Sequence, residues 1–287
     1  MKRLTVFILT GSAAIAAGLF FVVPPIAQFG WYHDFADQRS FLRIANFWNV
    51  ISNLPFLFAG GWGIWYLASI GAKDGLKDSS ERWMYLFFFF TVALTGIGSA
   101  YYHLEPNNDR LVWDRLPLAM MFMALFAIIV GERLSRHAAN LLFLPLVVLG
   151  AATVFYWHLT ETWGRGDLRP YLLTQIYPVF AILVILWLSP ATYSKTEKLY
   201  AAMAWYGGAK LYEFLDKPVY SFGQILSGHT LKHIGAAVSC YLILSWIRQR
   251  RPIENPIRQG EQTVTIMPPS SSLKEIVDRK QTTRCYL

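Results

Sequence analysis

Three histidines combine with a serine and an aspartate in a pattern that suits metal chemistry. His229 and His233 are spaced i, i+4, so a helix would present both rings on one face. Ser99 and His103 have the same spacing earlier in the chain, and Asp114 follows soon after them. Neutral imidazole is a favourable zinc ligand, and three protein nitrogens leave the fourth tetrahedral position to water. The pattern therefore indicates a zinc site made by His103, His229 and His233.

The two other polar residues of this group suit proton transfer. A zinc ion lowers the pKa of its bound water to roughly 7. Asp114 would accept that proton or orient the water, and Ser99 would donate a hydrogen bond to the water or to a developing oxyanion. Spacing alone leaves a simpler interpretation open. In that interpretation the histidines are ordinary residues at helix ends, and Lys232 extends its ammonium group to the membrane interface.

Long apolar segments must position these residues, since a membrane-spanning helix needs about 20 predominantly apolar residues. The candidate spans are 5–27, 46–70, 83–103, 115–133, 141–158, 171–189, 198–215 and 229–247. The span 198–215 is the weakest, because it contains Lys210 and Glu213. The pattern predicts an all-α fold, an integral membrane helical bundle in which seven candidate spans follow the N-terminal helix. All five polar residues of the candidate site then lie at one membrane face.

The first apolar segment has two interpretations. Lys2 and Arg3 precede it, as in a secretory signal peptide. However, the segment is longer than a usual signal core and ends at Pro24-Pro25 without a clear cleavage site, which favours a retained helix. The segment 251–287 is polar and too poor in apolar residues to fold alone. The predicted organisation is an N-terminal transmembrane helix over 1–28, a seven-helix domain over 29–250 and a flexible cytoplasmic tail over 251–287.

The composition supports a multi-pass membrane protein. Only 15% of the 287 residues are charged and 54% are hydrophobic, whereas about a quarter of the residues of a soluble domain are charged. Lys and Arg concentrate in the loops on the side of the N-terminus, which predicts that both termini are cytoplasmic. The net charge of +8 is explained in this way and does not indicate nucleic-acid binding. A bacterial inner membrane and an endoplasmic reticulum or Golgi membrane fit equally well, and the oligomeric state stays open.

The segments around these residues resemble the alkaline ceramidases, which belong to a wider superfamily of membrane hydrolases that includes adiponectin-receptor-like and GPI-remodelling proteins. The family pattern is Ser-x3-His, an Asp shortly before a Pro, and a late His-x3-His. It matches 98–103, 114–117 and 229–233 in order and spacing. The segment 46–53 also resembles the first core helix of the family.

The resemblance implies a seven-helix bundle with a zinc ion held by His103, His229 and His233. It places Asp114 and Ser99 at the family's catalytic positions. The implied reaction is hydrolysis of the N-acyl amide bond of ceramide-like lipids, which yields a sphingoid base and a fatty acid. Two alternatives stay open. One is a related acyl-ester lipid hydrolase, because nothing in the sequence distinguishes an amide from an ester, and the other is a non-enzymatic, receptor-like or metal-transporting bundle.

The resemblance also implies a calcium site in the loop before the first core helix. Asp34 and Asp37 match acidic positions of that site, but the loop is shorter than in the family, and Asn46 replaces an acidic residue. Calcium favours several hard oxygen ligands and gains affinity from carboxylate charge. Asp34, Asp37 and Asn46 are therefore calcium candidates. The competing interpretation is that the two aspartates pair with Arg39 and Arg43.

Overall fold

The computed structural model describes residues 2–69, 76 and 78–253 of the chain. Residue contacts divide the chain into two units, Met1–Arg251 and Pro252–Leu287. All helices of the described residues belong to the first unit. The predicted flexible tail falls almost entirely outside the described residues, as do the loop cations Lys73 and Lys77.

The described part of the chain contains helices and no extended strand, which confirms the predicted all-α fold. The helices are α1 (Lys2–Val22), the 3-10 helix η1 (Gly30–His33), α2 (Phe47–Ile51), α3 (Leu54–Ser69), α4 (Ser79–Leu104), α5 (Asn108–Arg133), α6 (Arg136–Thr162), α7 (Arg169–Leu188), α8 (Glu197–Phe214), α9 (Asp216–Ser221) and α10 (Gly228–Gln249). By length and composition, the segments able to cross a membrane are α1, α2 with α3, α4, α5, α6, α7 and α10. The protein is therefore a multi-pass membrane protein.

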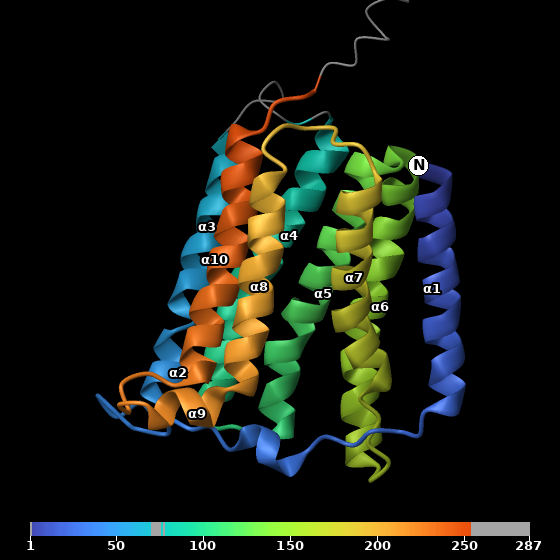
Figure 1. Ribbon diagram of the computed structural model, residues 1–287. Helices are drawn as coiled ribbons and strands as arrows, with labels where there is room; N and C mark the ends of the chain where they lie inside the picture. The colour runs from blue at the N-terminus through green and yellow to red at the C-terminus, as the bar shows by residue number, and fades with distance from the viewer. Residues whose placement is uncertain (1, 70–75, 77, 254–287) are drawn as a thin grey trace, which may run out of the picture. The chain divides into compact units, whose positions relative to one another are not determined.

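The helix α8 corresponds to the predicted span 198–215, which was the least apolar candidate. It is 18 residues long but carries Glu197, Lys198, Lys210 and Glu213, so apolarity alone does not identify it as a span. It nevertheless packs along the length of α10 (Figure 1). Lys198 and Glu213 have partners on α10, and these tertiary contacts compensate in part for the polar character of α8.

The helix α5 lies at the centre of the bundle, where it packs against α4, α6 and α7 (Figure 1). The helix α3 packs against α4 and α10, so the two ends of the core sequence meet. Apolar residues surround α5 on nearly all sides, as expected for a helix that is buried rather than amphipathic. This central helix begins near the end of the bundle that holds α2 and α9 and runs to the opposite end.

The N-terminal helix α1 lies at the edge of the bundle, next to α7 (Figure 1). The Tyr177 hydroxyl donates a hydrogen bond of 2.7 Å to the Leu9 carbonyl. Beyond the helix end, the Arg169 guanidinium donates to the carbonyls of Phe20 and Val23. The bonds from Arg169 satisfy carbonyls at the C-terminal end of α1 that have no partner within the helix. Together with the Tyr177 bond, they fix α1 to α7.

The predicted span 46–70 is divided into α2 and α3 at Ser52 and Asn53. Pro55 follows this break and has no N–H to donate to the Ile51 carbonyl, so the helical bonding cannot continue through it. The break turns Ser52 into the interior, where its side chain is buried. An irregular backbone inside a membrane bundle is tolerated where the protein buries it, and this one faces the histidines described below.

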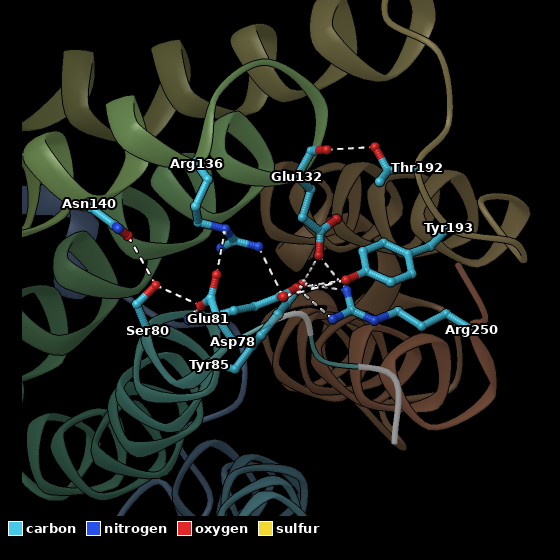
Figure 2. Close-up of polar contacts among 10 residues, drawn as sticks. All are labelled: Asp78, Ser80, Glu81, Tyr85, Glu132, Arg136, Asn140, Thr192, Tyr193 and Arg250. Carbon is cyan, nitrogen blue, oxygen red and sulfur yellow. Dashed lines mark hydrogen bonds and ion pairs between the residues drawn. The ribbon is translucent and has the colours of Figure 1, made fainter. Parts of the chain in front are cut away.

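Charged side chains meet in the core at the end of the bundle opposite α2 and α9, where Arg250 lies between two carboxylates (Figure 2). Its Nη2 atom lies 2.7 Å from Glu81 Oε1, and its Nη1 atom pairs with Glu132. Tyr85 donates a hydrogen bond of 2.6 Å to Glu132 Oε1, and Arg136 lies 2.9 Å from Glu81 Oε2. The side chains of Glu81, Glu132 and Arg250 are completely buried. The cluster joins α4, α5 and α6 to the residue that ends α10.

The balance of charges explains why this cluster is tolerated. Two carboxylates, Glu81 and Glu132, face two guanidinium groups, Arg136 and Arg250. Aromatic rings cover Arg250 as well, since its Cζ lies 4.0 Å from the centre of the Tyr193 ring. Removing one partner from a buried ion pair is costly, because it leaves a buried charge without compensation.

We therefore predict that Arg250→Met destabilises the protein strongly, because it leaves two buried carboxylates without their shared cation. The expected loss is about 3–5 kcal/mol of the free energy of unfolding. Thermal or denaturant unfolding of the purified protein in detergent measures it. Glu105→Gln is the control, since it removes the partner of Arg110 in a pair whose carboxylate is 70% exposed, and a change within about 0.5 kcal/mol is expected. An equal effect of both substitutions would contradict the structural role of the cluster.

Candidate metal centre

The structure brings His103, His229 and His233 together inside the bundle, although 126 residues separate the first from the second. All three side chains are buried. The candidate ligand atoms lie within 4.8 Å of one another, and Nε2 of His103 lies 3.3 Å from Nε2 of His229. Histidine nitrogens that converge in this way form a group that could hold a metal ion. Within the described residues, these three histidines are the one group of three or more possible metal ligands.

Asp216 fixes the start of the helix that carries two of the histidines. One carboxylate oxygen accepts a hydrogen bond of 2.7 Å from the backbone N–H of His229, in the first turn of α10. The other oxygen accepts one of 2.9 Å from the N–H of Ala36, in the loop after η1. Ser227 adds an N-cap bond of 3.1 Å to the N–H of Thr230. A negative side chain and an N-cap serine both stabilise a helix start, so the first turn of α10 is held firmly.

The chain also orients the imidazole rings. Nδ1 of His233 forms a hydrogen bond of 2.8 Å with the hydroxyl of Ser52, at the break between α2 and α3. Asn46 donates a hydrogen bond of 2.9 Å to the backbone carbonyl of His103 and so holds the end of α4. Nδ1 of His103 is buried and has no hydrogen-bond partner among the described residues. A second hydrogen bond to a ligating histidine sets its tautomer and orientation, and Ser52 provides that bond for His233.

The donor set fits a metal ion that prefers nitrogen ligands. Two facing imidazole nitrogens at 3.3 Å, in a buried site, can be joined either by one proton or by an ion that accepts both lone pairs. Three imidazoles without a carboxylate among the ligand atoms favour zinc and similar metals over calcium or magnesium, which prefer oxygen. The geometry therefore supports a site for a metal ion that prefers nitrogen ligands.

Ser99 and Asp114 lie side by side on neighbouring helices. The Ser99 hydroxyl hydrogen-bonds to the Asp114 carboxylate. A methyl group on Gly98 would lie 1.9 Å from the Trp113 carbonyl oxygen, so only glycine allows α4 and α5 to approach this closely. Pro117 follows Trp113 by one helical turn and has no N–H to bind that carbonyl. The carbonyl is therefore free to face Gly98, and this contact places Ser99 against Asp114.

A cavity of about 400 Å³ opens beside these residues. It is lined by Ser99, Asp114 and His233 at the histidine end. Phe56 and Leu118 line it further on, and the same two side chains also line a narrower apolar cavity that continues between the helices. One continuous lining therefore passes from polar to apolar.

The calcium candidates lie near the site but are engaged in other contacts. Asp37 is paired with Arg39, whose Nη2 and Nε atoms lie 2.7 and 2.9 Å from its carboxylate. Asp34 pairs with Lys217 at 2.6 Å, and this hydrogen-bonded ammonium lowers the pKa of Asp34 below its ordinary value. Asn46 has a left-handed backbone, with φ of 48°. The pairing of Asp37 with Arg39 agrees with the competing interpretation, whereas the partner of Asp34 is not an arginine. Calcium binding itself stays a prediction.

Sequence reasoning did not assign roles to Ser52 and Asp216. Ser52 lies within an apolar span. Its polar side chain, three residues before Pro55, is the feature of the sequence that points to a role. Asp216 follows Lys210 and Glu213 at three-residue spacing, a pattern that favours a structural ion-pair network over a helix cap. In the structure, Glu213 does pair with Lys210, and with Lys232 at 3.0 Å, but Asp216 binds backbone N–H groups instead.

We predict that Ser52→Ala weakens metal binding without unfolding the protein. His233 would lose the hydrogen bond that sets its ring orientation, and loss of such a bond typically costs about 10- to 100-fold in metal affinity. Titration against a metal chelator, with elemental analysis of the purified protein, measures the change. Ser239→Ala is the matched control, because this serine of α10 bonds the Ala202 carbonyl and not a histidine. Equal metal affinities of the two variants would contradict the positioning role.

We further predict that Gly98→Ala destabilises the bundle, because the added methyl group must separate α4 from α5. The expected cost is about 1–3 kcal/mol, as for other overpacked sites. Gly61→Ala provides the comparison, since a methyl group there meets no atom within 4 Å and alanine is about 1 kcal/mol more favourable than glycine in a helix. Unfolding experiments should therefore shift the two variants in opposite directions. A stable Gly98→Ala protein would show that the helices are not in close contact.

Comparison with known protein families agrees with the geometry. The Ceramidase family model matches residues 39–268, a range that contains the three histidines, Ser99 and Asp114. No match to a curated protein was found. The match covers well over half of the 287-residue chain and confirms the resemblance seen in the sequence. The chain therefore belongs to the Ceramidase family.

Proposed function

We propose that this protein is a zinc-dependent membrane lipid hydrolase that cleaves the N-acyl amide bond of ceramide-like sphingolipids. The observation that carries the proposal is the buried group of three histidines beside a cavity that Ser99 and Asp114 also line. Membership of the Ceramidase family supports the same reaction class. The products would be a sphingoid base and a fatty acid.

His103, His229 and His233 would hold the zinc ion. Three neutral imidazoles are typical of catalytic zinc sites, in which the remaining position binds water or substrate. When bound, zinc would polarise the scissile carbonyl and make water more acidic. The burial of all three rings supports this proposal, since a dry site strengthens such electrostatic effects.

Asp114 would act as the proton carrier of the reaction. Its carboxylate would take a proton from the attacking water while the carbon–oxygen bond forms. It would then deliver that proton to the nitrogen of the leaving sphingoid base while the carbon–nitrogen bond breaks. Ser99, which hydrogen-bonds to the carboxylate, would keep it turned toward the cavity. No other carboxylate among the described residues shares these contacts with both Ser99 and the cavity.

The lining of the cavity suits a lipid with one polar linkage. The polar end would hold the amide and the hydroxyl groups of the sphingoid base, and the apolar continuation past Phe56 and Leu118 would hold an alkyl chain. Leu172 and Ile176 of α7 line the cavity and are also exposed on the outside of the bundle. We propose that substrates enter from the membrane past this side of α7, since a ceramide would not cross water to reach the site.

We predict that Asp114→Asn removes amide hydrolysis while the metal stays bound. The asparagine keeps the size of the side chain but cannot accept and return a proton, and loss of a general acid–base typically costs about 10²- to 10⁴-fold in rate. The measurement is release of sphingoid base from a ceramide by the purified protein, with zinc content determined on the same samples. His229→Ala is the companion variant and should lose zinc and turnover together.

Two outcomes would contradict the proposal. Active protein that contains no zinc by elemental analysis would exclude the metal mechanism. Release of a lysophospholipid from membrane phospholipids, with no sphingoid base from ceramide, would identify an ester hydrolase of the same architecture. Full biological activity of Asp114→Asn would instead favour a receptor-like role.

A further inference from the structure

Arg115 follows the proposed proton carrier on α5 and is almost completely buried, with 4% of its surface exposed. Three aromatic rings surround its guanidinium group. Its Cζ atom lies 4.2 Å from the centre of the Trp157 ring, 4.7 Å from Tyr171 and 5.2 Å from Tyr32. These rings belong to α6, α7 and the 3-10 helix η1, so elements distant in the sequence join to hold one cation. The same guanidinium lines the 400 Å³ cavity.

The ring contacts do not satisfy the hydrogen bonds of this arginine. Ring faces attract a cation, but they supply no acceptor oxygen. Nε and Nη1 of Arg115 are buried and have no hydrogen-bond partner among the described residues. A buried donor without an acceptor costs about 1–3 kcal/mol, and more when it is charged. A protein that retains such a group in a cavity wall usually uses it to bind something.

Two neighbouring side chains also have hydrogen-bond donors without acceptors. Gln175 lies one helical turn after Tyr171 on α7 and lines the same cavity, and its Nε2 atom is buried without a partner. The indole Nε1 of Trp157, which can only donate, is also buried and unpartnered within the described part of the chain. Donors without partners from α5 and α7 therefore line the cavity, and a further one belongs to the α6 ring that contacts Arg115.

The charges of the cavity lining point to the same kind of ligand. Its cations are Arg115, Lys210 and Lys232, and its carboxylates are Asp114 and Glu213. Both lysines hydrogen-bond to Glu213, and Asp114 bonds to Ser99. Three positive groups thus face two negative ones, and among the described residues no carboxylate lies within ion-pair distance of Arg115. One anionic oxygen group would balance the lining.

We propose that Arg115, with Gln175, forms a binding subsite for the carboxylate of a fatty acid. A planar guanidinium binds a carboxylate in a two-point contact through Nη2 together with either Nε or Nη1. Within the described part of the chain, no hydrogen bond or ion pair engages Nε or Nη1 of Arg115. The apolar lining that leads away from the cavity would take the alkyl chain. The subsite stands on the geometry, whereas the identification of its ligand as the released acyl product rests on the proposed function. Arg115 would then draw the acid away from the reacting groups after the amide bond breaks.

Direct binding to the full-length protein in detergent tests this proposal without turnover. Radiolabelled oleate is bound at equilibrium and displaced by unlabelled oleate or by oleyl alcohol, which has the same chain but no charge. The wild-type protein should prefer oleate. Arg115→Met should weaken oleate binding by about 10- to 100-fold, the usual effect of losing a hydrogen bond to a charged group, and should leave oleyl alcohol unchanged. Gln175→Leu should cause a smaller loss with the same selectivity.

Arg110→Met is the matched control, because it removes a cation from the same helix that pairs with Glu105 and does not line the cavity. It should leave the affinity for both ligands unchanged. Zinc content and the midpoint of thermal unfolding verify that each variant is folded. If Arg115→Met does not fold, Arg115→Lys and Gln175→Leu are measured instead. Both substitutions should lower the preference for oleate over oleyl alcohol.

Two results would contradict the proposed carboxylate subsite. One is oleate affinity that is insensitive to both Arg115 and Gln175 but lost in His229→Ala, which would place the carboxylate on the metal. Another is equal affinity of the wild-type protein for oleate and oleyl alcohol. Oleate binding that depends on Arg115, in a protein that does not hydrolyse ceramide, would remove the proposed function and leave the anionic subsite intact.

Discussion

The contact between the Trp113 carbonyl and Gly98 determines the geometry of the histidine end. Pro117 leaves that carbonyl without a helical partner, and Gly98 has no side chain to keep it away. The helices α4 and α5 can then approach closely enough for Ser99 to bond Asp114. The Asp-x-x-Pro part of the motif therefore has a packing role beside the chemical role proposed for Asp114, because the proline positions the helix that carries the aspartate.

Charged side chains of opposite sign are paired at both ends of the bundle. At one end Arg250 lies between two carboxylates, and at the other Glu213 lies between two lysines. The Arg250 cluster joins helices that are distant in the sequence, and its completely buried groups are costly to leave unpaired. Arg115 departs from this pairing, since rings rather than carboxylates surround it. The departure occurs beside the candidate site, where incomplete pairing is compatible with ligand binding.

Much of the helical architecture and the histidine group could be predicted from the sequence, because each rests on a local pattern. Apolar length predicts spans, and i, i+4 spacing places His229 and His233 on one face. The Arg250 cluster could not be predicted, since Glu81 and Glu132 each lie at a span end, where a charge is ordinary. Their burial arises only when three helices meet. Ser52 was likewise hidden, because its role depends on a helix break that turns it toward His233.

The origin of the three histidines has a consequence for how the protein is made. One comes from α4 and two come from α10, the last described helix, and His229 follows His103 by 126 positions. At a synthesis rate of about 5–20 residues per second, roughly 6–25 s pass between the appearance of these two side chains. During that interval the nascent chain presents a single imidazole of the group, which binds a metal ion weakly. Under the proposed function, metal uptake would therefore be a late event in biogenesis, and an occupied centre would indicate that α10 has been inserted and packed.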